Sequence, residues 1–128
     1  MENHITMRKS EIYDDVVNDV CEICEVSRDS LLSESRLQPL VDARILVVQY
    51  LRRLGFGFDE ITLNIIRERA DTPDYKPPII EIRKKSKNLR RQFCCYTLRC
   101  LDSKMFQRLS RELKQRLLAK YPDCEEDL

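Results

Sequence analysis

The sequence predicts an all-α protein of about six helices, and three observations carry this prediction. Apolar residues recur at the three- and four-residue spacing of helices through most of the chain. Strand signals are nearly absent. Only two glycines occur among the 128 residues, which disfavours a fold built from tight β-hairpins. The length suffices for one domain with a modest core.

Two helices are expected before residue 33, over about 10–25 and 27–32. Ser10 and Ser27 each precede a periodic run, and serine is a favoured residue for capping a helix N-terminus. The apolar residues of the first run follow the 3.6-residue period of a helix, and they are Ile12, Val16, Val17, Val20, Ile23 and Cys24.

A third helix is expected over about 39–54 and a fourth over about 58–69. Pro39 suits the first turn of a helix, and the run that follows it is apolar nearly all round. Such a helix is usually the buried centre of an all-α domain. Gly55 suits the C-terminal stop of this helix, and Gly57 can cap the next one.

The remaining residues, 77–128, are expected to form a basic helical extension of a core made by residues 1–76. Helices over 79–100 and 104–120 have so short a link that an antiparallel pair is predicted. An acidic tail follows at 121–128. The apolar stripes are Ile79, Ile82, Leu89, Phe93, Tyr96 and Cys100 in the first helix of the pair, and Phe106, Leu109, Leu113 and Leu117 in the second.

The net charge of +1 conceals an uneven distribution. Residues 1–75 hold 9 Lys/Arg and 15 Asp/Glu, whereas residues 76–120 hold 14 Lys/Arg and only 3 Asp/Glu. This asymmetry favours a polyanionic partner, and a solvated helical surface explains it equally well. No apolar run approaches the roughly 18 residues of a membrane span, and the polar N-terminus is unlike a signal peptide, so a cytoplasmic protein is expected.

The six cysteines and the single histidine form no motif that carries chemistry. Cys21 and Cys24 form a Cys-x-x-Cys inside an amphipathic run, so core or surface thiols are expected rather than zinc ligands or disulfides. His4, in a terminus expected to fray, leaves a Cys or Ser nucleophile without a base. We therefore expect no enzyme, no metal and no cofactor; a zinc-stabilised regulator is the least favoured alternative.

Residues 16–62 carry a resemblance to a known family. The matching positions are Val16-Val17, Val20-Cys21-Glu22, Val26-Ser27, Leu31-Leu32-Ser33-Glu34-Ser35-Arg36, Ala43-Arg44, Tyr50-Leu51-Arg52-Arg53-Leu54 and Glu60-Ile61. In order and spacing this stretch resembles the C-terminal DNA-binding domain of the bacterial replication initiator DnaA. The resemblance implies a helical domain that contains a helix-turn-helix of the Trp-repressor type, here without the ATPase domain of the full initiator.

The second signature of that family, which opens its recognition helix, is altered in this chain. Residues 65–73 stand where the family reads Phe-Gly-x-Arg-Asp-His-Ser/Thr-Thr, and residues 74–84 offer a substitute with a longer turn. In the substitute, Asp74 takes the place of the family's Asp, and Arg83-Lys84 follow like its Arg-Lys pair. The family's His and Thr are replaced, so its base readout is not carried over.

Several cations are the expected contacts to DNA. Arg36 matches a family arginine that enters a minor groove, and an exposed linker charge is its alternative. Arg44 leaves an otherwise apolar face, so it needs a phosphate or a carboxylate of the first helices as partner. The basic helix offers phosphate contacts, or simply keeps its surface solvated. The complete set of expected contacts consists of the cations Arg36, Arg44, Arg67, Arg69, Lys76, Arg83, Lys84, Lys87, Arg90 and Arg91, together with Tyr75, which can reach or stack on a base near the turn or serve in packing.

The sequence thus predicts a helix-turn-helix protein that binds double-stranded DNA, with a role in replication initiation or its regulation implied by the resemblance alone. The alternative is a protein-interaction module that kept the scaffold and lost the DNA readout. In that alternative the basic helices bind an acidic partner, or the chain forms a homodimer through residues 79–120.

Overall fold

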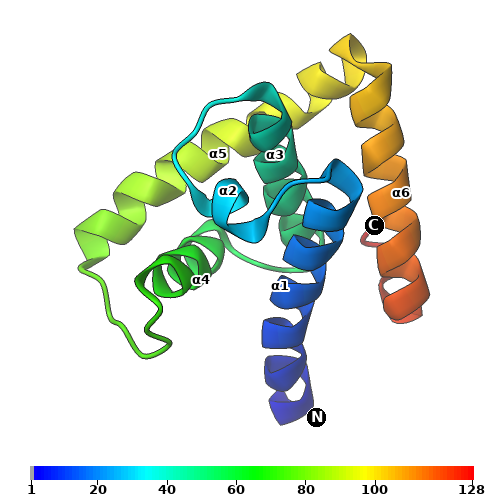
Figure 1. The fold of residues 1–128 in the computed structure, drawn as a ribbon. Helices are drawn as coiled ribbons and strands as arrows, with labels where there is room; N and C mark the ends of the chain where they lie inside the picture. The colour runs from blue at the N-terminus through cyan, green and yellow to red at the C-terminus, as the bar shows by residue number, and fades with distance from the viewer. Residues whose placement is uncertain (1) are drawn as a thin grey trace.

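The computed structural model describes residues 2–128, with side chains described from Lys9 onward. Helices make up most of this part of the chain, and no strand occurs in it, which confirms the all-α class (Figure 1). The elements in order are α1 (Glu2–Cys24), α2 (Arg28–Leu32), α3 (Gln38–Arg53), α4 (Phe58–Ala70), α5 (Ile79–Asp102), α6 (Lys104–Lys120) and the short 3₁₀ helix η1 (Pro122–Cys124).

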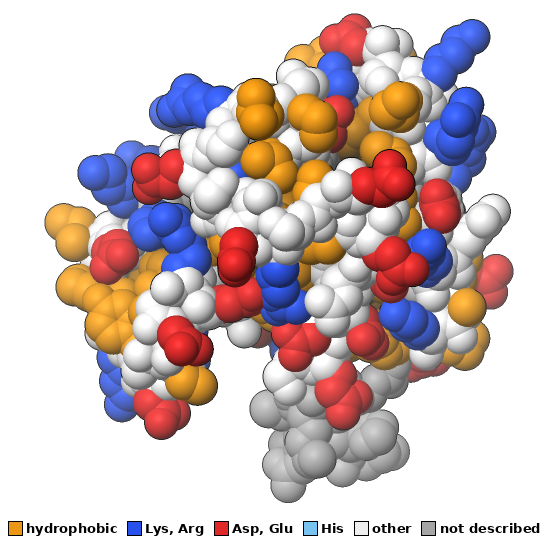
Figure 2. Space-filling view, viewed as in Figure 1, with side chains coloured by type: hydrophobic (Ala, Val, Ile, Leu, Met, Phe, Trp, Pro, Cys, Tyr) orange, Lys and Arg blue, Asp and Glu red, His pale blue; other side chains and the backbone are white. Residues whose placement is uncertain are grey.

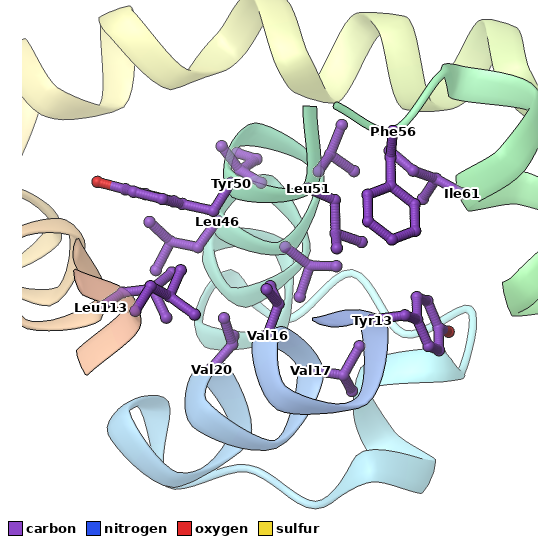
Figure 3. Close-up of a cluster of buried hydrophobic side chains, with 14 of the residues drawn as sticks. Tyr13, Val16, Val17, Val20, Leu46, Tyr50, Leu51, Phe56, Ile61 and Leu113 are labelled. Atoms are coloured by element: carbon purple, nitrogen blue, oxygen red, sulfur yellow. The ribbon is translucent and has the colours of Figure 1, made fainter. Parts of the chain in front are cut away.

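Helix α3 is the central helix, as its nearly continuous apolar character predicted. Leu46 and Leu51 are fully buried, and side chains of α1 and α6 converge on them, including Val16, Val20 and Leu113 (Figure 3). The expected stripe of α6 is largely confirmed, because Phe106, Leu113 and Leu117 are all fully buried.

Most helix ends lie within two residues of their predicted positions, and capping groups explain them. The Ser27 hydroxyl accepts from the Ser30 amide at 3.1 Å, and the Ser103 hydroxyl caps α6 by accepting from the Phe106 amide. Gly55 ends α3 with a φ of +97°, which favours glycine. The exception is Ser10: α1 begins at Glu2, so Ser10 lies inside the helix and the prediction that it caps the N-terminus was wrong.

The expected antiparallel pair of α5 and α6 forms only at their shared corner. There the Tyr96 hydroxyl lies 2.5 Å from the Ser110 hydroxyl, and the Tyr96 ring packs edge-on against Phe106. Away from the corner the helices diverge: α5 crosses α3 and α4, while α6 runs beside α1 (Figure 1). The Lys120 ammonium at the end of α6 contacts both carboxylate oxygens of Asp19 in α1 at 3.0 Å.

Residues of the basic extension belong to the same hydrophobic core as the first four helices. Leu89 of α5 and Phe106 of α6 are buried in one cluster with residues of α1 and α3. Helix α5 is held to α4 by an edge-on ring pair, Phe58 with Phe93, at 5.6 Å between centroids. Ile79 departs from the predicted stripe, because it is 65% exposed where α5 begins beyond the reach of the core.

Over residues 2–128, which the structure describes, no helix has both the length and the apolar character of a membrane span.

Candidate functional site

A hollow of about 680 Å³ opens where α2, the loop of residues 33–37, α3, α4 and α5 meet. Its floor is apolar and includes Val41 and Val48 of α3, Ile65 of α4 and Leu89 of α5. The charged side chains that line it are mostly cationic: among the described residues, five are Lys or Arg and one, Glu34, is a carboxylate. The five cations, from four separate segments of the chain, are Arg36, Arg44, Arg69, Lys85 and Arg91.

Arg44 lies at the inner wall of this hollow and holds the 33–37 loop in place. Its Nε donates to the Leu31 carbonyl at 2.7 Å, its Nη2 donates to the Ser33 carbonyl at 2.6 Å, and its Nη1 donates to the Ser35 carbonyl. The guanidinium therefore pairs with main-chain oxygens, and the alternative of an ion pair with a carboxylate of the first helices was wrong. Burial, together with the nearby Arg69 charge, lowers the pKa of Arg44.

The other arginines of the hollow are held by fewer contacts than Arg44. Arg36 and Arg91 are exposed, and no ion pair is recorded for either among the described residues. Arg69 has a contact of 3.8 Å with Glu34, whose side chain is itself 88% exposed. Such exposed pairs neutralise little charge. The rim of the hollow thus presents guanidinium groups that an anionic partner can reach.

Helix α5 continues this cationic surface beyond the hollow. Arg83, Lys84 and Lys87 are exposed and, at 100° per residue, point away from the buried side marked by Leu89. Lys and Arg side chains lie along the α5 side of the molecule and also along the α6 edge, whereas Asp and Glu prevail over α1 (Figure 2). We define the basic surface as Arg36, Arg69, Arg83, Lys84, Lys87 and Arg91.

Five expected contact residues lie outside this surface, and one of them is Arg44, described above. The Arg90 guanidinium is engaged over the Phe58 ring, at 4.6 Å from its centroid. Arg67 donates from Nε to the Tyr75 carbonyl at 2.9 Å and so ties the end of α4 to the α4–α5 connection. Tyr75 and Lys76 are exposed on that connection.

The hollow also contains groups that sequence reasoning missed. Lys85, Asn88 and Gln92 line it from one flank of α5. Their spacing of three and four residues places them on one side of the helix, and this spacing was the signal available in the sequence.

Ser86, which interrupts the apolar stripe of α5, joins this helix to α4 by hydrogen bonds. It donates to Asp59 at 2.6 Å and lies 2.9 Å from the Thr62 hydroxyl.

The six cysteines are free thiols. Cys21 and Cys24 are half-buried on α1, and burial raises the pKa of both, that of Cys24 to about 12. Within the described residues, no three His, Cys, Asp or Glu side chains are grouped so that they could hold a metal ion. Cys94 and Cys95 are exposed on α5.

No family model, curated protein or solved structure matches this chain. The fold and the site therefore define the molecule by themselves. It is an all-helical protein whose loop 33–37, α4 and α5 place cations around one hollow.

Proposed function

We propose that this protein binds double-stranded DNA through the basic surface. One observation carries the proposal: cations from the 33–37 loop, from α4 and from α5 surround the same hollow, with Glu34 as the only carboxylate in its lining. Cations that come from several segments and carry few compensating carboxylates match the closely spaced phosphates of a duplex.

The placement of α4 and α5 also supports a helix-turn-helix mode of docking. The two helices pack through Phe58 and Phe93 and are joined by residues 71–78, a longer connection than the three- or four-residue turn of the motif that the DnaA resemblance implies. The first turns of α5 extend from the body of the molecule, with Ile80 76% exposed beside Arg83 and Lys84 (Figure 1). A major groove, about 12 Å wide, admits such a helix, and Arg36 is available for the adjacent minor groove.

The process in which this protein would bind DNA is suggested only by its resemblance to the DnaA DNA-binding domain. We propose replication initiation or its regulation as the process, with a sequence preference that differs from that of the family because residues 65–84 depart from its signature. Selection of bound duplexes from a random pool tests for this preference. An enriched sequence motif among the bound duplexes supports readout of specific bases. Recovery of all sequences alike would mean that the protein contacts only the phosphate backbone.

Binding itself is tested by titrating a duplex at several salt concentrations. We expect the combined change Arg83→Ala, Lys84→Ala and Lys87→Ala to weaken binding at least roughly tenfold at low salt and to reduce the salt slope by about 0.9 for each lost phosphate contact. The matched control removes three exposed cations of α6, Arg108, Arg111 and Lys114, which lie away from the first turns of α5 (Figure 1). An equal loss in both variants, or no binding by the unmodified protein, contradicts the proposal.

A protein partner is the second candidate, favoured by exposed apolar side chains at the α5–α6 corner. Leu98, Leu101 and Met105 are 61%, 75% and 68% exposed. A homodimer through residues 79–120 can use these side chains, whereas Leu113 and Leu117 are fully buried in the core. Sedimentation of the protein with and without Leu98→Asp and Leu101→Asp distinguishes a dimer, which these changes dissociate, from a monomer.

A further inference from the structure

We propose that the hollow binds a small phosphorylated ligand with a flat aromatic group, of the nucleoside diphosphate class. The inference rests on the separation of an apolar floor from a cationic rim within one cavity. It does not rest on the proposed DNA binding, because it concerns the interior of the hollow, which a duplex is too wide to enter; the two ligands would share only the arginines of the rim.

The size and the lining of the hollow suit such a ligand. Small-molecule sites usually measure about 300–1,000 Å³ and combine apolar walls with a few polar groups, and this hollow of about 680 Å³ does the same. Val41, Val48, Ile65 and Leu89 offer an apolar surface against which a base can lie. These four residues come from three helices that pack together in the core, so the floor is formed before any ligand arrives.

The rim supplies the charges that phosphates require. Arg36, Arg69 and Arg91 approach the hollow from three segments, and a guanidinium binds phosphate oxygens in a bidentate manner. Arg44, fixed by main-chain carbonyls, adds a positive charge that Glu34 alone does not balance. An anion between these groups relieves their mutual repulsion.

The α5 wall supplies groups that can recognise the edge of a base. The side-chain amides of Asn88 and Gln92 lie one turn apart on this wall and provide both donors and acceptors. Gln92 Oε1 is buried, and among the described residues no donor reaches it. A guanine carries a ring N–H and an amino donor beside a carbonyl acceptor, so its edge is complementary to a side-chain amide, and a turn of the Gln92 side chain toward the hollow would let its oxygen accept from such an N–H.

Calorimetric titration in the absence of DNA tests the proposal, with guanosine diphosphate, guanosine and pyrophosphate as the three probes. We expect the diphosphate to bind more tightly than either of its parts, because only the whole molecule contacts both floor and rim. Arg69→Gln and Arg91→Gln should each weaken its binding about tenfold, which is the worth of one charge-assisted hydrogen bond. Arg83→Gln and Lys84→Gln, exposed on α5 and outside the lining of the hollow, are the matched controls and should leave binding unchanged.

Three results would overturn the proposal. These are no binding of guanosine diphosphate at millimolar concentration, equal binding of pyrophosphate and the diphosphate, or a loss that follows the control variants instead of the rim variants. Circular dichroism and thermal melting confirm that each variant is folded, and Arg36→Gln replaces any rim variant that is not. If duplex binding fails while the diphosphate still binds, only the proposed function is lost. If both bind, the diphosphate should compete with the duplex through Arg36 and Arg91.

Discussion

At the scale of single residues, Arg44 shows how a cation predicted to contact a partner can instead organise the site. Its N–H groups are engaged by the carbonyls of Leu31 and of the 33–37 loop, so besides its charge it acts on a ligand through the position of Arg36. The sequence predicted that this charge needs a partner. The carbonyls of an irregular loop form no pattern along the chain, and so the partner itself was not predictable.

The change Arg44→Lys tests this role. A lysine keeps the positive charge, but its ammonium cannot span the separated carbonyls of Leu31, Ser33 and Ser35. We expect the free energy of unfolding to fall by about 1–3 kcal/mol, measured by urea denaturation, because buried carbonyls lose their donors. Faster amide exchange should be confined to the loop and α2. Unchanged stability and exchange would show that Arg44 does not hold the loop.

The raised pKa of the Cys24 thiol predicts that the protein loses stability in alkaline solution. Burial raises its pKa in the folded protein to about 12, well above the value in an unfolded chain. As pH rises above about 9, the unfolded chain releases this proton while the folded protein retains it, so unfolding becomes more favourable. Denaturation between pH 8 and pH 10.5 should show a smaller decline for Cys24→Ala than for the unmodified protein. Parallel declines would contradict the assignment.

At the scale of elements, local signals located the helices well and their mutual directions poorly. The caps Ser27 and Gly57 were identifiable because their effects act within one turn, whereas the cap Ser103 was not predicted. The direction of α5 relative to α6 was not, because a short link permits either a hairpin or a corner. Contacts remote in sequence decide between them: Arg99 of α5 binds Asp42 of α3 at 2.8 and 2.9 Å.

The cap of α6 gives a prediction at this scale. Ser103→Ala removes the oxygen that accepts from the Phe106 amide, so the free energy of unfolding should fall by about 1 kcal/mol. Thr97→Ala, at an exposed position within α5, is the control and should be neutral or slightly stabilising. Chemical denaturation measures both. A Ser103 variant as stable as the control would show that the hydroxyl does not cap α6.

At the scale of the whole molecule, the basic region divides its charges between two tasks. Two cations in the last turns of α6 face the acidic residues of α1: Lys120 and Arg116 lie within 4 Å of Asp19, which is only 5% exposed. The cations of the basic surface on α5 have no such counterpart. Composition showed the excess of positive charge, but only the packing of α6 on α1 shows which part of it stays available.

The free energy of unfolding should depend on the ion pairs between α6 and α1 and not on the exposed cations of α5. Asp19→Asn leaves the α6 cations without their buried partner, so we expect a loss of about 1–3 kcal/mol in the free energy of unfolding. Lys84→Ala and Lys87→Ala should change it by no more than about 0.5 kcal/mol, since both side chains are exposed. Thermal melting at low and high salt compares them. A larger loss from the α5 changes would place structural ion pairs on α5 instead of on α6.

The outward stripe of α5 has a consequence for engineering and for evolution. Residues 80, 83, 84, 87 and 91 are solvent-facing positions on a helix that is anchored by its other side. Replacing them alters what the helix can recognise at little thermodynamic cost, so a library randomised there should yield mostly folded members. The architecture thereby offers a frame on which new specificities can be selected without first repairing the scaffold.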